Sequence, residues 1–212
     1  MVLPAGTLRI GPGDWEAAGI EPREAVMSAF AIDAYEVTEA RWQRCIDAGK
    51  CAPEDTVGGG AREPGLPVTG KTLGEAEALC ASAGGRLSSA NELAWAAAGA
   101  AGRRYPWGDT GAVCRRAVWG MVDGPCAHDA VGPDLTGSRP DGASPEGVFD
   151  LAGNVAEWAR GEGAERAEVR GGTFRDEAAA RLRSWNRRDA PAELRSAEVG
   201  FRCTYAAPPP AP

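Results

Sequence analysis

The chain has 212 residues, with 23 basic and 30 acidic side chains and a formal net charge of −7 at pH 7. This length suits one large domain or two small ones, and we expect one. The acidic balance provides no overall positive field for a polyphosphate, so nucleic acid is not an expected partner. No apolar run approaches the ~20 residues that a membrane helix needs, so no membrane span is expected.

The composition, with 29 glycines and 16 prolines, indicates a loop-rich fold in which turns separate short elements. Weak alternation predicts a first strand over residues 2–9, and an apolar run predicts a second strand over residues 25–35. Thr38 is placed to cap a helix that passes through Cys45 and stops at Gly49. A bridge from Cys45 to the next cysteine would fasten the exit of this helix.

Thr72, with Glu75 three residues later, forms a capping box that predicts a second helix, and residues 90–98 are expected to form a third. Between residues 99 and 147 no regular element of length is apparent. A coil this long predicts an ordered functional or metal-organised segment.

The last strands are expected over residues 169–175 and 198–205. We expect a single domain over residues 1–205, followed by a flexible proline-rich tail over residues 206–212.

The six cysteines could form disulfides, bind a metal as thiolates or remain free thiols. There is no Cys-x-x-Cys pair, and His128 is the only histidine, so zinc and three-histidine iron sites lack ligands. We therefore favour three disulfides, which indicate an oxidising extracytoplasmic location: periplasmic, cell-surface or secreted. The first residues lack the segments of a signal peptide, so an exported protein would have had a leader that this chain does not contain.

Residues 149–158 read Phe-Asp-Leu-Ala-Gly-Asn-Val-Ala-Glu-Trp. Calcium takes six to eight oxygen ligands at ~2.3–2.6 Å and accepts carbonyl oxygens as readily as carboxylates. An irregular turn here could offer the side chains of Asp150 and Glu157 and the carbonyls of Gly153 and Val155. The alternative is that the first carboxylate caps a turn, the second pairs with an arginine, and the closing tryptophan lies in the core.

Several segments, taken in chain order, resemble the formylglycine-generating enzyme and sulfatase-modifying-factor family. They cover nearly the whole chain and read Leu-Pro-Ala-Gly-Thr-Leu-Arg-Ile-Gly at 3–11, Tyr-Glu-Val-Thr at 35–38, Pro-Val-Thr-Gly at 67–70, Gly-Arg-Leu at 85–87, Tyr-Pro-Trp-Gly at 105–108, the motif at 150–158, Arg-Gly-Gly-Thr-Phe at 170–174 and Gly-Phe-Arg-Cys at 200–203. The resemblance implies an α+β fold, the compact, loop-rich formylglycine-generating-enzyme variant of the C-type lectin fold. Family members that bind calcium use the pattern at 150–157, so one calcium ion is the expected cofactor.

The resemblance also implies that Cys80, in the helix before Gly-Arg-Leu, pairs with Cys203 in the last strand. A second family disulfide is missing on both sides, where Ala97 and Ser184 stand near the expected positions. The remaining pairs are assigned by sequence proximity: Cys45 with Cys51, and Cys114 with Cys126.

The family's named activity requires two cysteines between Arg-Gly-Gly-Thr-Phe and Gly-Phe-Arg, whose thiolates bind copper(I), a soft ion. No cysteine lies between Cys126 and Cys203, so we expect neither copper nor formylglycine generation. The resemblance then implies a noncatalytic module, a pseudoenzyme that calcium and disulfides stabilise. The alternative is an enzyme with divergent, non-copper chemistry in the same cleft, where charged residues such as Asp176 and Glu177 could lie.

Folds of the C-type lectin class display variable loops on a stable scaffold, which suits ligand binding. We expect the former active-site surface to recognise a protein, a peptide or a glycan, because tryptophans beside arginines favour protein anchoring or stacking on a sugar ring. The module would be attached to a larger polypeptide through its N-terminus or its tail. The residues of this predicted ligand surface are Trp158, Phe174, Arg175, Arg183, Ser184, Trp185 and Asn186.

Overall fold

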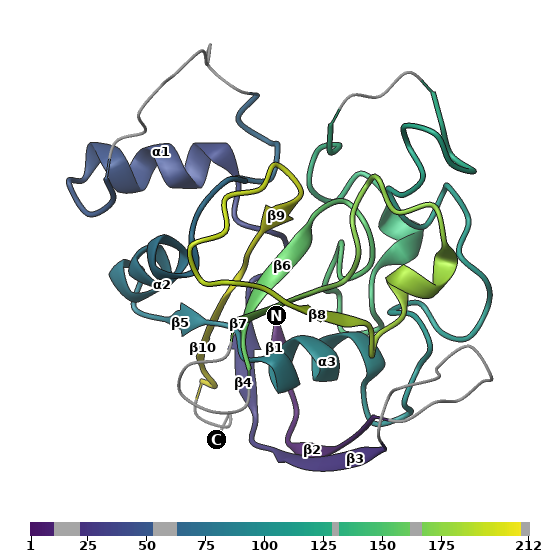
Figure 1. Cartoon of the computed structure of the whole chain (residues 1–212). Coiled ribbons are helices and arrows are strands. Elements are labelled where there is room, and N and C mark those ends of the chain that lie inside the picture. The colour runs from purple at the N-terminus through teal and green to yellow at the C-terminus, as the bar shows by residue number, and fades with distance from the viewer. Residues whose placement is uncertain (11–21, 53–62, 129–131, 162–166, 209–212) are drawn as a thin grey trace.

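The computed structural model describes residues 1–10, 22–52, 63–128, 132–161 and 167–208 (Figure 1). The helices of this part are α1 (Glu39–Asp47), α2 (Leu73–Ser82) and α3 (Ala90–Ala98). The strands are β1 (Val2–Leu3), β2 (Gly6–Ile10), β3 (Arg23–Met27), β4 (Phe30–Ile32), β5 (Arg86–Leu87), β6 (Ala156–Arg160), β7 (Ala167–Arg170), β8 (Arg187–Asp189), β9 (Val199–Gly200) and β10 (Cys203–Ala206). They form two four-stranded sheets, in the orders β1-β4-β10-β5 and β8-β7-β6-β9, and a two-stranded ribbon of β2 and β3.

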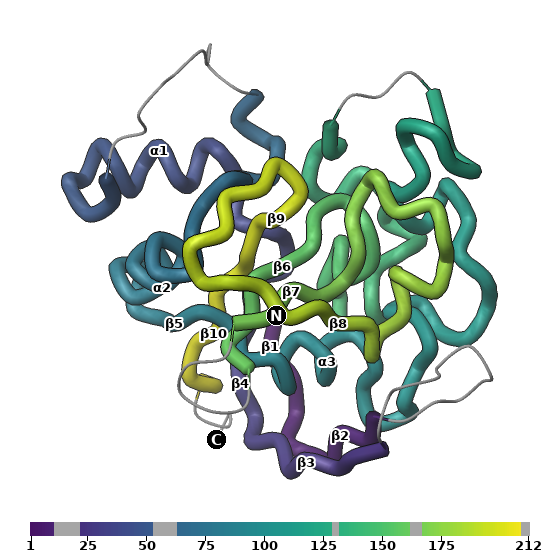
Figure 2. Tube along the Cα trace, viewed as in Figure 1, coloured from purple at the N-terminus to yellow at the C-terminus, as the bar shows by residue number. Residues whose placement is uncertain are grey.

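The first four-stranded sheet brings the beginning and the end of the chain together, as the trace in Figure 2 shows. Val2 lies opposite Ala31 of β4, and Thr204 lies opposite Ile32 on the other edge of the same strand. β10 extends to Ala206, one residue past the expected domain end. Residues 209–212 of the expected tail lie outside the described residues.

The two predicted N-terminal strands are each divided. β1 pairs with β4, whereas β2 pairs with β3, so residues 2–9 serve two different sheets. Pro4 lies at the division, and a proline has no N–H to donate to a ladder. Residues 25–35 divide in the same way between β3 and β4.

The predicted helix starts are confirmed. The Thr38 side chain accepts a hydrogen bond from the Arg41 N–H at the start of α1, and Thr72 forms a capping box with Glu75 at the start of α2. The third helix occupies residues 90–98 as expected, with a second capping box between Ser89 and Glu92. These signals lie within four residues of each other, which is why the sequence alone locates them.

α3 lies between the β2-β3 ribbon and the second four-stranded sheet, and its alanines let both approach closely (Figure 1). Trp95 projects from this helix toward the N-terminal strands. Its indole N–H donates to the Pro4 carbonyl at 3.0 Å, and a Cβ on Gly6 would come within 2.7 Å of the ring. The closeness of this contact requires glycine at position 6.

The C-terminal strand predictions need correction. The strand expected over residues 169–175 ends at Arg170, because Gly171 and Gly172 take positive φ angles of 95° and 74° and turn the chain away. Residues 198–205 divide between β9 and β10, which belong to different sheets. β6 and β8 were not predicted.

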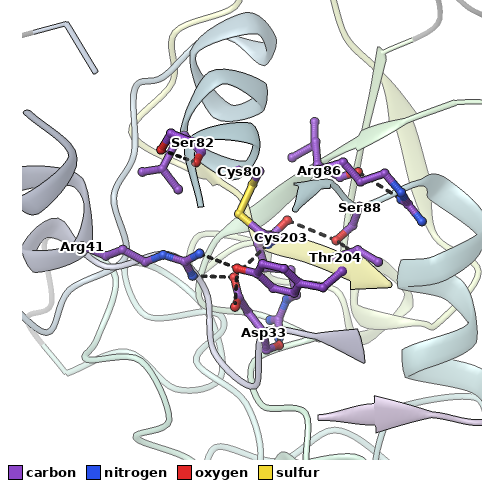
Figure 3. The surroundings of a disulfide bond; sticks show 12 residues. Asp33, Arg41, Cys80, Ser82, Arg86, Ser88, Cys203 and Thr204 are labelled. Atoms are coloured by element: carbon purple, nitrogen blue, oxygen red, sulfur yellow. Dashed lines mark hydrogen bonds and ion pairs between the residues drawn. A yellow bond between two sulfur atoms is a disulfide. The ribbon is translucent and has the colours of Figure 1, made fainter. Parts of the chain in front are cut away.

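The structure contains the three expected disulfides, Cys45–Cys51, Cys80–Cys203 and Cys114–Cys126. Figure 3 shows Cys80 on α2 joined to Cys203 on β10, beside the ion pair of Arg41 and Asp33 at 2.5 Å. Within the described part of residues 99–147, regular structure is limited to a 3-10 helix at Pro140–Gly142, as predicted. None of the helices in the described chain has the length and apolar character that a bilayer crossing requires.

Candidate metal centre and ligand surface

The segment predicted to bind calcium is a buried turn that leads into β6. Asp150 and Asn154 adopt left-handed φ angles of 56° and 61°, and Gly153 has a φ of 89°. A Cβ on Gly153 would lie 2.5 Å from the Val118 carbonyl oxygen, so only glycine fits there. The backbone is therefore irregular at the positions from which the carbonyl ligands were expected.

Glu157 forms a bidentate ion pair with Arg202, in which Nε donates to Oε2 at 2.7 Å and Nη2 donates to Oε1 at 2.6 Å. The side chains are 3% and 0% exposed respectively. The guanidinium also donates to the carbonyls of Asp33, Ala34 and Phe149 at 3.1, 3.2 and 2.7 Å. Arg202 thus links Phe149, at the start of the motif, to Glu157 on β6, near its end.

Asp150 accepts a hydrogen bond at 2.6 Å from the Gly137 N–H, which lies on the long coil. Burial raises the pKa of Asp150 from its ordinary 3.8 to about 6, against the lowering effects of the Gly137 N–H and Arg202. Glu36, which is buried beside the motif, has a pKa raised well above its ordinary value, first by burial and then by repulsion from Asp150 and Glu157.

The residues present fit a divalent cation. Glu36, Asp150 and Glu157 are buried and interact electrostatically, and Arg202 pairs with Glu157, so a divalent cation would favour the ionised form of the other two carboxylates. A carboxylate oxygen has two lone pairs, so the hydrogen bonds from Arg202 leave Glu157 able to ligate a cation. Among the described residues no three His, Cys, Asp or Glu side chains are grouped as metal ligands, but the expected site uses only two side chains.

The alternative interpretation of the motif also describes real contacts. Asp150 caps a turn of the coil, Glu157 pairs with an arginine, and Trp158 lies in the core with its indole N–H donating to the Lys71 carbonyl at 2.8 Å. These contacts and a cation are compatible, because neither backbone carbonyl expected as a ligand takes part in them.

Most of the residues predicted to form the ligand surface are buried in the structure. Trp158, Phe174, Arg183, Ser184 and Trp185 are buried, and only Arg175 and Asn186 remain accessible. The physical reason is packing: Trp185 joins the hydrophobic cluster around α3, whereas Phe174 and Trp158 belong to two other clusters of the core.

Asp176, one of the charged residues considered for a divergent active site, makes a local hydrogen bond at the surface. The Asp176 carboxylate accepts a hydrogen bond from the Thr173 N–H at 2.8 Å, and Arg175 lies 3.5 Å from Glu198. His128 bonds to the Cys126 carbonyl at 2.9 Å through Nδ1.

Three residues at the candidate site were missed in the sequence: Glu36, Asn154 and Arg202. Glu36 lies in the Tyr-Glu-Val-Thr segment and Arg202 in Gly-Phe-Arg-Cys, but their approach to the motif depends on the tertiary fold. Asn154 had a local signal, since asparagine between a glycine and a β-branched residue is suited to a left-handed backbone.

The arrangement of short sheets, three helices and a long ordered coil is the formylglycine-generating-enzyme variant of the C-type lectin fold, an α+β fold. The chain belongs to the formylglycine-generating-enzyme and sulfatase-modifying-factor family, because the family model for the Sulfatase-modifying factor enzyme 1-like domain matches residues 1–207. The comparison with curated proteins returns no match.

Solved structures agree with this fold. PvdO from Pseudomonas aeruginosa is 25% identical, with a TM-score of 0.76 over 97% of this chain and 93% of that chain. Treponema denticola variable protein 1 is 18% identical, with a TM-score of 0.71 over 97% and 94% of the two chains. The Major Tropism Determinant I1 variant is 14% identical, with a TM-score of 0.52 over 84% of this chain and 50% of that chain.

Proposed function

We propose that the protein is a noncatalytic, extracytoplasmic binding module that one calcium ion and three disulfides stabilise. The observation that supports the cation is the burial of Asp150 and Glu157 on one irregular turn with left-handed backbone angles. A divalent ion at the motif would stabilise their ionised forms through hard oxygen ligands. The side chains of Asp150 and Glu157, with the carbonyls of Gly153 and Val155, would hold it.

The cysteines support a noncatalytic role. All six are used in disulfides, so no thiolate is left to bind copper(I) as formylglycine generation requires. Disulfides at this density also suit an oxidising compartment such as the periplasm, the cell surface or the medium.

The ligand we propose is a protein, a peptide or a glycan, and its contacts would come from the accessible part of the predicted ligand surface. Arg175 is half exposed. The Asn186 amide donates to the Arg181 carbonyl at 2.7 Å, which places Arg181 beside Asn186. Arg181 is exposed and makes no ion pair with another described side chain. A guanidinium without an ion-pair partner favours bidentate contacts with carboxylates, so an acidic ligand is favoured.

The test is a binding screen of calcium-loaded protein against acidic peptides and glycans, repeated with two variants. Arg175→Ala/Arg181→Ala should weaken a specific hit by at least tenfold. Arg9→Ala removes another exposed arginine, on β2, and should leave binding unchanged. Chemical conversion of the ligand by wild-type protein would contradict the noncatalytic role, and equal binding by all three proteins would contradict the surface.

A further inference from the structure

Glu36 is a buried carboxylate that reaches the cation motif from a distant part of the chain. It is 2% exposed and directly precedes Val37, at the entry to α1. Oε2 accepts a hydrogen bond from the Asn154 amide at 2.7 Å, and Oε1 accepts from the Val155 N–H at 3.2 Å. Both oxygens are thus bound to the two residues at the centre of the motif.

Asn154 is fixed by all of its polar groups. Its N–H donates to the Val118 carbonyl at 2.7 Å, and its carbonyl accepts from the Phe174 N–H at 2.8 Å. Its side-chain oxygen accepts from the Asp134 N–H at 2.9 Å, and its side-chain amide donates to Glu36. Four segments of the chain therefore meet at one residue in a left-handed conformation.

Because a peptide bond is planar, a hydrogen bond that fixes its N–H also fixes the direction of its carbonyl, and this applies to both expected carbonyl ligands. The Gly153 carbonyl shares a peptide with the Asn154 N–H, so the bond to Val118 sets its direction. The Val155 carbonyl shares a peptide with the Ala156 N–H, which donates to the Glu198 carbonyl at 2.9 Å. Glu36 restrains the residues between these two peptides, and it does so through both of its oxygens.

We propose that Glu36 is a positioning residue for the cation site: it holds Asn154 and Val155 so that the carbonyls on either side face the ion. This inference rests on the proposed calcium site. Partners that orient metal ligands typically contribute about 10–100-fold to metal affinity.

The test compares Glu36→Gln with Glu92→Gln in calcium-free protein titrated with Ca²⁺. A glutamine has one acceptor oxygen and presents an amide N–H₂ to the second donor, so Glu36→Gln loses a hydrogen bond to Asn154 or Val155. The control, Glu92, is also a buried carboxylate that accepts from a backbone N–H, that of Ser89 at 2.9 Å. We expect Glu36→Gln to weaken calcium binding about 10–100-fold, and Glu92→Gln to lower stability without changing the affinity.

Two further measurements separate positioning from general damage. Hydrogen exchange at the Val155 amide should be faster in Glu36→Gln than in Glu92→Gln, even without calcium. Asn154→Gly keeps the left-handed backbone but removes the side-chain links to Glu36 and to the Asp134 N–H, so it should weaken calcium binding even if Glu36→Gln fails to fold. Equal calcium affinities in wild type and folded Glu36→Gln, or in wild type and Asn154→Gly, would overturn the positioning role of Glu36 but not the proposed calcium site. Wild-type protein that binds no calcium would overturn the proposed site as well.

Discussion

Arg202 and Glu157 form a bidentate ion pair in the protein interior, with N–O distances of 2.6 and 2.7 Å. The pair ties the Gly-Phe-Arg-Cys segment to the cation motif, and the remaining N–H groups of Arg202 reach three backbone carbonyls. A lysine could not replace these contacts, because an ammonium lacks the planar fork of a guanidinium.

We therefore expect Arg202→Lys to destabilise the protein by about 1–3 kcal/mol for each buried acceptor that loses its hydrogen bond. Arg195→Lys is the matched control, since Arg195 binds Glu75 in the same bidentate way at 2.7 and 2.8 Å but is 56% exposed. That change should cost less than about 1 kcal/mol. Urea unfolding measures the free energy of unfolding of both variants. Equal losses would show that the buried pair stabilises the protein no more than the exposed pair does.

The stability of the calcium-free protein should fall as the pH rises from 5 to 8. The pKa of Asp150 is raised to about 6 from an ordinary 3.8, so the folded state binds this proton more tightly than the unfolded chain does. Its contribution is present below about pH 4 and is lost as the pH rises through about 6. Glu36, whose pKa is also raised, acts in the same direction and adds to the loss.

Glu75 and Glu92 contribute to stability with the opposite pH dependence, because their pKa values are lowered in the folded state. Hydrogen bonds from Arg195 lower the pKa of Glu75. The pKa of Glu92 is raised by burial but is lowered overall by hydrogen bonds from Arg86 and Ser89. Their contribution is lost only as the pH falls below about 4.5, so it does not confound the range from 5 to 8. Asp150→Asn should flatten the pH dependence in urea unfolding. A calcium-free wild type whose stability rises across this range would contradict the assignment.

The helices and disulfides could be predicted because their determinants are local or belong to the family pattern. Thr38, Thr72 and Glu75 act within one turn of their helices. Strand bounds could not be predicted, since Pro4 lies between two strands whose partners, β4 and β3, are set by the tertiary fold.

The candidate site could be predicted only in part for the same reason. Asp150 and Glu157 stand out in the sequence, but Glu36 reaches Asn154 across 118 positions and Arg202 reaches Glu157 across 45. The burial of most residues predicted for the ligand surface could not be foreseen, because a tryptophan beside an arginine has the same pattern in a core as on a surface. The burial of Trp185 against the α3 cluster depends on packing that no local motif records.

An engineered disulfide should form between positions 97 and 184, where the family bridge is missing. Ala97 and Ser184 line the same small pocket, and the Ser184 hydroxyl has no hydrogen-bond partner in the described structure. Closing a loop of about 90 residues adds at most about 4–5 kcal/mol in the chain-entropy model. We expect Ala97→Cys/Ser184→Cys to contain no free thiol and to melt at a higher temperature than wild type.

The single variants Ala97→Cys and Ser184→Cys are the controls for this prediction. Each should show one free thiol and no gain in melting temperature. Two free thiols in the oxidised double variant would mean that the two positions are not in bridging distance.

Calcium binding by the motif is the central claim, and isothermal titration calorimetry of Ca²⁺ into calcium-free protein tests it most directly. We predict one ion per chain in wild type and in Asp141→Asn, which alters an aspartate that is 61% exposed. Binding should be lost in Asp150→Ala, because an asparagine at this position would still offer an oxygen ligand. Wild-type protein that takes up no calcium, or Asp150→Ala that binds as tightly as wild type, would contradict the claim.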